Sequence, residues 1–101
     1  MTDRELLELA AKAVGLRLAA WDGIFGEMFA IDDDNGDTWM PHFNDGDALR
    51  LAVKLGIFTA TERLQSFHAF YSDEIRRDSP PTIATRRAIV RAAAEIGRAM
   101  P

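Results

Sequence analysis

The chain has 101 residues and no cysteine, with 48% hydrophobic and 28% charged residues, a composition typical of globular rather than disordered proteins. The absence of cysteine excludes disulfides and thiolate chemistry and agrees with a cytoplasmic protein, and no apolar stretch approaches the roughly 20 residues needed to cross a bilayer. We expect one soluble domain over residues 1–101, located in the cytoplasm and with no membrane association.

The net charge of −4 conceals an asymmetry along the chain. Residues 1–47 contain eleven acidic and three basic side chains, whereas residues 76–101 contain six arginines and two acids. The favoured interpretation is that the two ends attract each other within one fold. A basic face could alternatively bind nucleic-acid phosphates or the acidic half of a second copy, and the sequence leaves the oligomeric state open.

Helical periodicity predicts a first helix that is capped by Thr2 or Asp3 and ends at Gly15. The residues expected on its apolar arc are Leu6, Leu9, Ala10, Ala13 and Val14. An apolar arc this wide indicates a helix that is covered on more than one side or that lies on a sheet.

Two extended segments, 15–22 and 28–34, follow the first helix. Asn35-Gly36 is a favoured two-residue hairpin turn, because both residues tolerate positive φ. This turn would place Ile31 opposite Met40 and Phe29 opposite His42, and we expect the strand to end at Pro41, which lacks an amide hydrogen.

The acidic segment around this turn, IDDDNGDTWMPHF, does not fit a calcium-binding EF-hand loop. If Gly36 is the sixth position, the first position is Ile31 and the twelfth is His42, and neither supplies the required carboxylate. We therefore predict no metal site and no cofactor. Trp39, beside the turn, is expected to be half-buried, with a ligand or partner surface as the alternative.

A second helix is predicted from its cap, Asn44 or Asp45, to Gly56. Its inward positions are Leu49, Leu51, Ala52, Val53 and Leu55, and its outward positions are Arg50 and Lys54. The similarity of LELAAK (7–12) to LRLAVK (49–54) suggests that a hairpin also follows the second helix.

Residues 57–72 are accordingly assigned to a second hairpin. Phe67, Ala69 and Tyr71 alternate as they would in a strand. An alternative stays open, because Leu64, Phe67, Tyr71 and Ile75 also fit one face of a helix.

The last helix is predicted to start near Ser79, because Pro80 suits a first helical position. Its polar stripe consists of Arg87, Arg91, Glu95 and Arg98. Arg86 lies instead on the apolar arc, where it requires a carboxylate such as Asp45 or Asp47, an aromatic ring or an interface.

The segments MTDRELLELAAKAVG, Trp39-Met40-Pro41, NDGDALRLAVKLG and ATRRAIVRAAAEIGRAM together resemble the phage alpha-beta-alpha sandwich domain family of small phage and prophage proteins. The resemblance implies a compact domain with helices packed on an antiparallel sheet of two hairpins. It implies no known activity. The positions that match the family's recurring motifs, with no assigned role, are Trp39, Pro41, Asp45, Gly46, Asp47, Arg86 and Arg87.

The sequence therefore predicts an α+β domain of order α-β-β-α-β-β-α, with about four antiparallel strands and three helices. No catalytic residues are predicted, and the expected role is non-enzymatic. We expect a phage or prophage accessory protein that binds an unknown protein partner through Trp39 or the arginine stripe. The alternative is weak nucleic-acid binding through the helical arginines Arg86, Arg87, Arg91 and Arg98.

Overall fold

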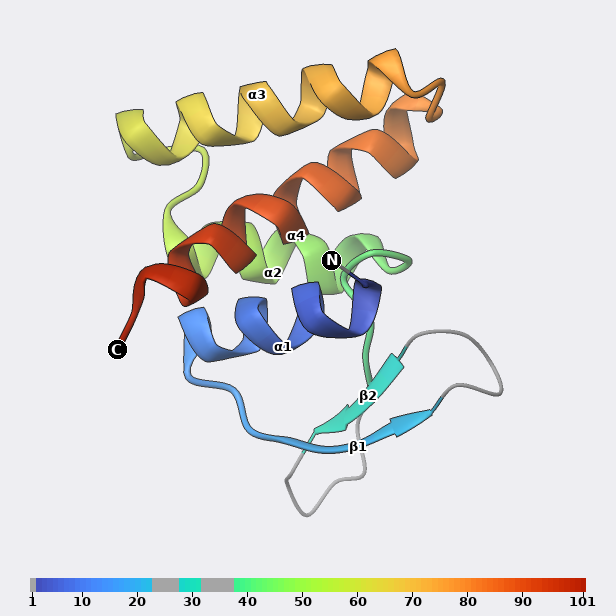
Figure 1. Ribbon diagram of the computed structural model, residues 1–101, viewed down its shortest axis with the longest axis vertical. Coiled ribbons are helices and arrows are strands. Elements are labelled where there is room, and N and C mark those ends of the chain that lie inside the picture. The colour runs from blue at the N-terminus through green and yellow to red at the C-terminus, as the bar shows by residue number, and fades with distance from the viewer. Residues whose placement is uncertain (1, 23–27, 32–37) are drawn as a thin grey trace.

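The computed structural model describes residues 2–22, 28–31 and 38–101. The helices in these ranges are α1 (Asp3–Val14), α2 (Asp45–Leu55), α3 (Thr61–Arg76) and α4 (Pro81–Ala99), and the strands are β1 (Leu18–Asp22), β2 (Met28–Ile31) and β3 (Thr38–Trp39). Helices dominate this part of the chain (Figure 1). The predicted α+β fold with a four-stranded sheet is wrong, and so is the alpha+beta sandwich that the family resemblance implies.

The centre of the domain is α4, which contacts each of the other three helices. Figure 1 shows α4 between α3 and α1. Its buried positions are mostly small: Ala84, Ala88, Ile89, Val90, Ala92, Ala93, Ala94 and Gly97. Small side chains allow helix axes to approach closely, and a Cβ at Gly97 would lie only 1.9 Å from the carbonyl oxygen of Leu9 in α1.

The predicted ends of α1 and α2 are confirmed. Thr2 accepts a hydrogen bond from the amide of Glu5, and Asn44 accepts one from the amide of Asp47. Gly15 and Gly56 close the two helices with φ of 71° and 63°, in the left-handed region that glycine adopts without a Cβ clash. Local sequence therefore sets where both helices begin and end.

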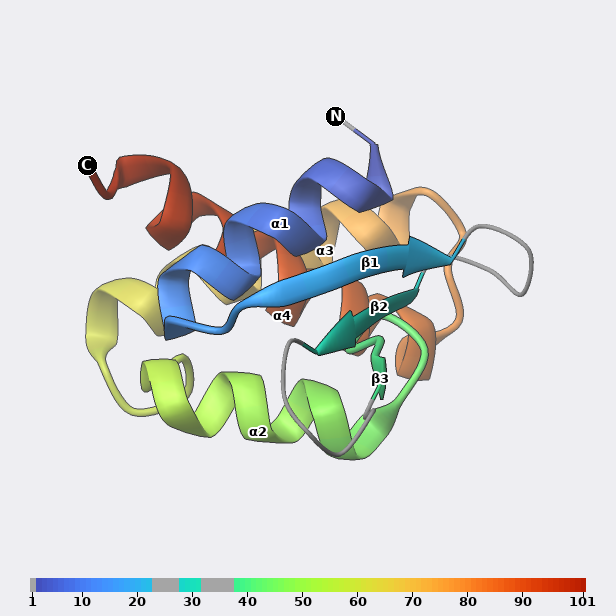
Figure 2. The ribbon, with the colours of Figure 1, turned by 90° about the horizontal axis from the view of Figure 1, so that it is seen from below.

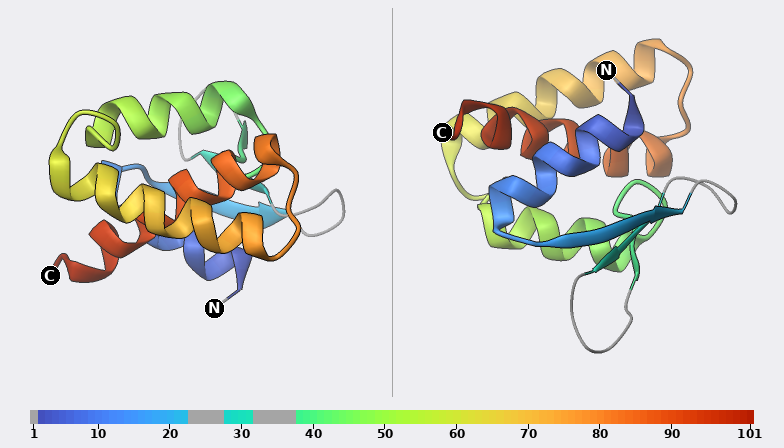
Figure 3. Two further views of the ribbon diagram at one scale, coloured as in Figure 1. Left: turned by 90° about the horizontal axis from the view of Figure 1, so that it is seen from above. Right: turned by 60° about the horizontal axis from the view of Figure 1, so that its bottom comes forward.

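The second predicted hairpin does not form, because residues 61–76 fold as α3. The helical alternative is the correct one: Phe67 is buried, and Leu64 and Tyr71 pack against the core. α3 packs along α4, as Figure 3 shows from two directions. A short run that alternates over only three positions does not distinguish a strand from a helix. The burial of these side chains against α4 favours the helix over the strand.

The three strands form one small antiparallel sheet in the order β1-β2-β3. Phe29 lies opposite Trp39, not opposite His42, so the predicted register is wrong. His42 does not pair with Phe29 because β3 ends at Trp39: a turn follows, in which the amides of Phe43 and Asn44 both donate to the carbonyl of Met40. The predicted Asn35-Gly36 turn lies outside the described residues. The sheet lies beside α1 and α2, away from α3 (Figure 2).

The inward face of α2 was only partly predicted. Leu51, Ala52 and Leu55 are buried as expected. Leu49 and Val53 are not, since 58% and 71% of their surface is exposed. The packing of α2 on α4 covers a narrower arc than the apolar pattern of the sequence indicates.

Within the described ranges, no helix has the length and apolar character required to cross a membrane.

We expect Gly97→Ala to lower the free energy of unfolding by about 2 kcal/mol or more, because the added methyl group would overlap the backbone of Leu9 and force α1 away from α4. Denaturant unfolding would measure the change. Gly46→Ala is the matched control, since its Cβ would meet only side-chain atoms, at 3.2 Å or more. Equal stability of Gly97→Ala and the unmodified protein would contradict the close approach of the two helices.

Candidate functional site

Two arginines of the predicted stripe are held by carboxylates from α1 and α3. Arg87 reaches Asp3 in α1 through an Nη2–Oδ1 contact of 2.9 Å and Glu74 in α3 through an Nε–Oε1 contact of 3.4 Å. Arg91 reaches the second oxygen of Glu74 at 2.9 Å and Asp73 at 2.8 Å. We call these five residues the carboxylate–arginine network. It joins three helices through side chains.

The network is partly shielded from water. Glu74 is buried, with 6% of its side chain exposed, and Ser79 donates a further hydrogen bond to its Oε1. Arg91 also lies over the ring of Phe70, with Cζ 4.5 Å from the ring centroid, a favourable cation–π geometry. Its guanidinium is therefore engaged on its edge by acids and on its face by an aromatic ring.

The arginines stabilise the ionised form of two acids in the network. The hydrogen bond from Arg87 lowers the pKa of Asp3 below its ordinary value; burial opposes this shift, and the nearby charges of Arg87 and His42 add to it. The hydrogen bond from Arg91 likewise lowers the pKa of Asp73. Both shifts favour the ionised carboxylates of Asp3 and Asp73, which face the arginines.

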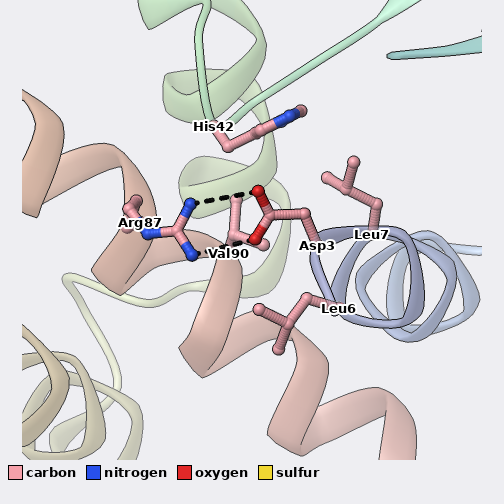
Figure 4. Close-up of a pocket in the computed structure, with 6 residues that line it drawn as sticks. All are labelled: Asp3, Leu6, Leu7, His42, Arg87 and Val90. Carbon is pink, nitrogen blue, oxygen red and sulfur yellow. Dashed lines mark hydrogen bonds and ion pairs between the residues drawn. The ribbon is translucent and has the colours of Figure 1, made fainter. Parts of the chain in front are cut away.

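A small pocket lies beside the Asp3–Arg87 pair. Figure 4 shows the carboxylate of Asp3 and the guanidinium of Arg87 facing each other, with His42 above them. The residues that line it are Asp3, Leu6, Leu7, His42, Arg87 and Val90, and its volume is about 10 Å³. That is about the space of one water molecule, so the cavity is too small for an organic ligand.

The other two predicted arginines lie apart from the network. Arg86 donates to the carbonyl of His42 at 3.2 Å and pairs with Asp45 at 2.7 Å, which confirms the carboxylate partner expected from its place on the apolar arc. Arg98 is exposed near the C-terminal end of α4 and pairs with Glu95 at 2.5 Å. The predicted arginine stripe is therefore not one continuous basic surface.

Trp39 is buried, with 6% of its surface exposed. It contributes to the wall of an open groove of about 580 Å³ between the end of α1, β3 and α2. The groove is lined by Val14, Gly15, Leu16, Thr38, Trp39, Asp47, Arg50, Leu51 and Lys54. The position of the ring fits a packing role rather than an exposed anchor for a partner.

In the part of the chain that the structure describes, no cluster of three or more His, Asp or Glu side chains is arranged to hold a metal ion. The acidic residues Asp32, Asp33 and Asp34 lie outside that part.

The feature that the sequence prediction missed is the outer face of α2, by which we mean Leu49 and Val53; Phe58 lies near Leu49, and both line one recess. Leu49 and Val53 are one helical turn apart, and Phe58 is 41% exposed. Next to them is an open, mostly apolar recess of about 350 Å³, whose lining includes Leu49, Phe58 and Ile89. The signal was present in the sequence, because the apolar arc of α2 is too wide to be buried on a single helix.

Comparison of the chain with protein-family models, curated proteins and solved structures finds no match. The functional argument therefore depends on the geometry of the chain itself.

We expect Glu74→Gln to lower the free energy of unfolding by about 3 kcal/mol, because it removes the acid that Arg87 and Arg91 share in a buried setting. Glu95→Gln is the matched control: it breaks an exposed arginine pair on α4 and should cost less than about 1 kcal/mol. Chemical denaturation of both variants measures the difference. If both variants lost the same free energy of unfolding, burial would not strengthen the ion pairs of the network.

The Asp3–Arg87 pair should make stability depend on pH in the acidic range. Since the folded pKa of Asp3 lies below its ordinary value of 3.8, its contribution is present above pH 3.8 and is lost as the pH falls through the folded pKa. Asp3→Asn should therefore be less stable than the unmodified protein near neutral pH, and the gap should close below pH 3.8. Urea unfolding across this range tests the sign, and a gap that widens on acidification would refute it.

Proposed function

We propose that the protein is a non-enzymatic protein-interaction module that docks through the outer face of α2. The observation that carries this proposal is the exposure of Leu49 and Val53 side by side on one helix. Of the seven large apolar residues that are exposed in the described part of the chain, four lie between residues 43 and 58: Phe43, Leu49, Val53 and Phe58. Leu49 and Val53 are neighbours on one face of α2, and contiguous exposed apolar side chains are typical of docking surfaces.

The surfaces first expected to bind a partner are less suited to that role. Trp39 is buried, and the guanidinium groups of Arg86, Arg87 and Arg91 are held by acids. A phosphate would have to displace those carboxylates, which argues against nucleic-acid binding through the arginines.

We place this module in the cytoplasm, because the chain has no cysteine and so does not depend on an oxidising compartment. The proposed phage or prophage origin is supported by the resemblance of the sequence segments alone, since the fold implied by that resemblance is not the one observed.

A photo-reactive phenylalanine analogue placed at Val53 should capture a protein in extracts of the encoding organism, and Leu49→Glu should abolish the adduct. The matched control carries the same analogue at Gln65, an exposed position on α3. Mass spectrometry would identify the captured species. Equal capture from the two positions, or no adduct at position 53, would refute docking through α2.

A further inference from the structure

We propose that the recess between α2 and α4 binds a small carboxylic acid that carries a short apolar group. We call it the Arg86 recess, after the cation in its lining. Its volume is about 350 Å³, and sites for small organic ligands measure roughly 300–1,000 Å³ and combine a mostly apolar lining with a few polar groups. The proposal does not depend on docking through α2: Leu49 belongs to both surfaces, but Val53 is not among the residues that line the recess.

The apolar wall of the Arg86 recess comes from three parts of the chain. Ala48 and Leu49 belong to α2, Phe58 follows α2, and Ile89 belongs to α4. Ala48 and Ile89 are buried, so the packing of the core fixes the floor, and an edge-to-face contact with Phe67 at 4.9 Å supports the ring of Phe58. Leu49 and Phe58 are 58% and 41% exposed. Their exposed surface is what the apolar group of a ligand would cover.

Arg86 supplies the positive charge of the recess. Only 17% of its side chain is exposed, and its Nε donates to the backbone carbonyl of His42 at 3.2 Å, which orients the guanidinium. Nη1 donates to Oδ1 of Asp45 at 2.7 Å. Among the described residues, none accepts a hydrogen bond from Nη2. The guanidinium therefore retains donors for a carboxylate, the group that its planar fork binds best.

The pairing with Asp45 leaves Arg86 open to a ligand. The side chain of Asp45 is 84% exposed, and an ion pair with so exposed an acid contributes little. The acids that hold Arg87 and Arg91 differ, since their side chains are at most 32% exposed. A ligand carboxylate would bind Nη2 and compete with Asp45 for Nη1, and the displaced acid would return to water.

The charge of the recess favours an anion over a cation. Asp45 is the only acid among its described lining residues. The first turn of α4, which supplies Thr82, contains no acidic residue and no side-chain cap, so the positive end of the helix dipole acts in the same direction as Arg86. A ligand with its carboxylate on Arg86 can place its apolar group against Leu49 and Phe58, because these residues line the same recess.

Nuclear magnetic resonance titration of the full chain tests the chemistry of the site. Hexanoate, hexanamide and hexylamine are suitable probes, because they share one apolar chain and carry a negative, a neutral and a positive head group at neutral pH. We expect hexanoate to shift the methyl signals of Leu49 and Ile89 and to bind about tenfold more tightly than hexanamide or hexylamine. Hexanoate that binds no more tightly than the other two, that does not saturate, or that shifts only residues outside the recess would overturn the proposal.

Arg86→Gln tests whether the guanidinium holds the carboxylate. This variant should weaken hexanoate binding about tenfold and leave the affinity for hexanamide nearly unchanged. Arg98→Gln is the matched control: it removes the same charge from an exposed position near the other end of α4 and should leave the affinity for hexanoate unchanged. Equal effects of the two variants would mean that net charge, not the recess, attracts the probe.

Asp45→Asn distinguishes the two charged groups of the recess. Because Asp45 is so exposed, this variant should fold, as circular dichroism can verify. It should strengthen hexanoate binding about threefold, since the acid that competes for Nη1 is removed. Weaker binding would show that Asp45 itself holds the ligand, and unchanged binding would show that no exchange of carboxylates takes place on Arg86. Either result would overturn the arrangement.

Discussion

The fold depends on the small residues of α4. A helix can contact three others only if its side chains leave room on several sides, and the alanines of α4 together with Gly97 provide that room. The closest approach is between Gly97 in α4 and Leu9 in α1. The helices at the two ends of the chain therefore pack directly against each other. The N-terminal helix and the arginine-rich C-terminal helix are thereby placed side by side, which brings Asp3 within reach of Arg87.

This packing explains why the arginines of α4 do not form a basic surface. A central helix has little solvent-facing surface of its own, so Arg87 and Arg91 extend between helices and meet Asp3, Asp73 and Glu74. The pairs are formed in surroundings that exclude some water, which strengthens each contact and raises the cost of losing one partner. Arg87 and Arg91 join α1, α3 and α4, so their main role is structural.

The sequence predicted the features that depend on neighbouring residues and failed on those that depend on distant ones. The caps at Thr2 and Asn44 and the ends at Gly15 and Gly56 follow from local chemistry. The pairing of Arg86 with Asp45, 41 residues away, is the exception, and it was expected because an arginine on an apolar arc requires a partner. The assignment of residues 57–72 failed because Phe67 and Tyr71 fit either a strand or a helix until α4 is present to cover them. The predicted pairing of Phe29 with His42 failed because β3 ends at Trp39, before the turn at Met40–Asn44, and this turn could not be inferred from the Asn35-Gly36 signal.

The exposure of Leu49 and Val53 follows from the same geometry that buries the rest of α2. One helix resting on another covers an arc that Ala48, Leu51, Ala52 and Leu55 already fill. Leu49 and Val53, on the opposite arc, add nothing to the packing of the monomer. They expose apolar surface to water, and the burial of that surface would be favourable by roughly 25 cal/mol per Å².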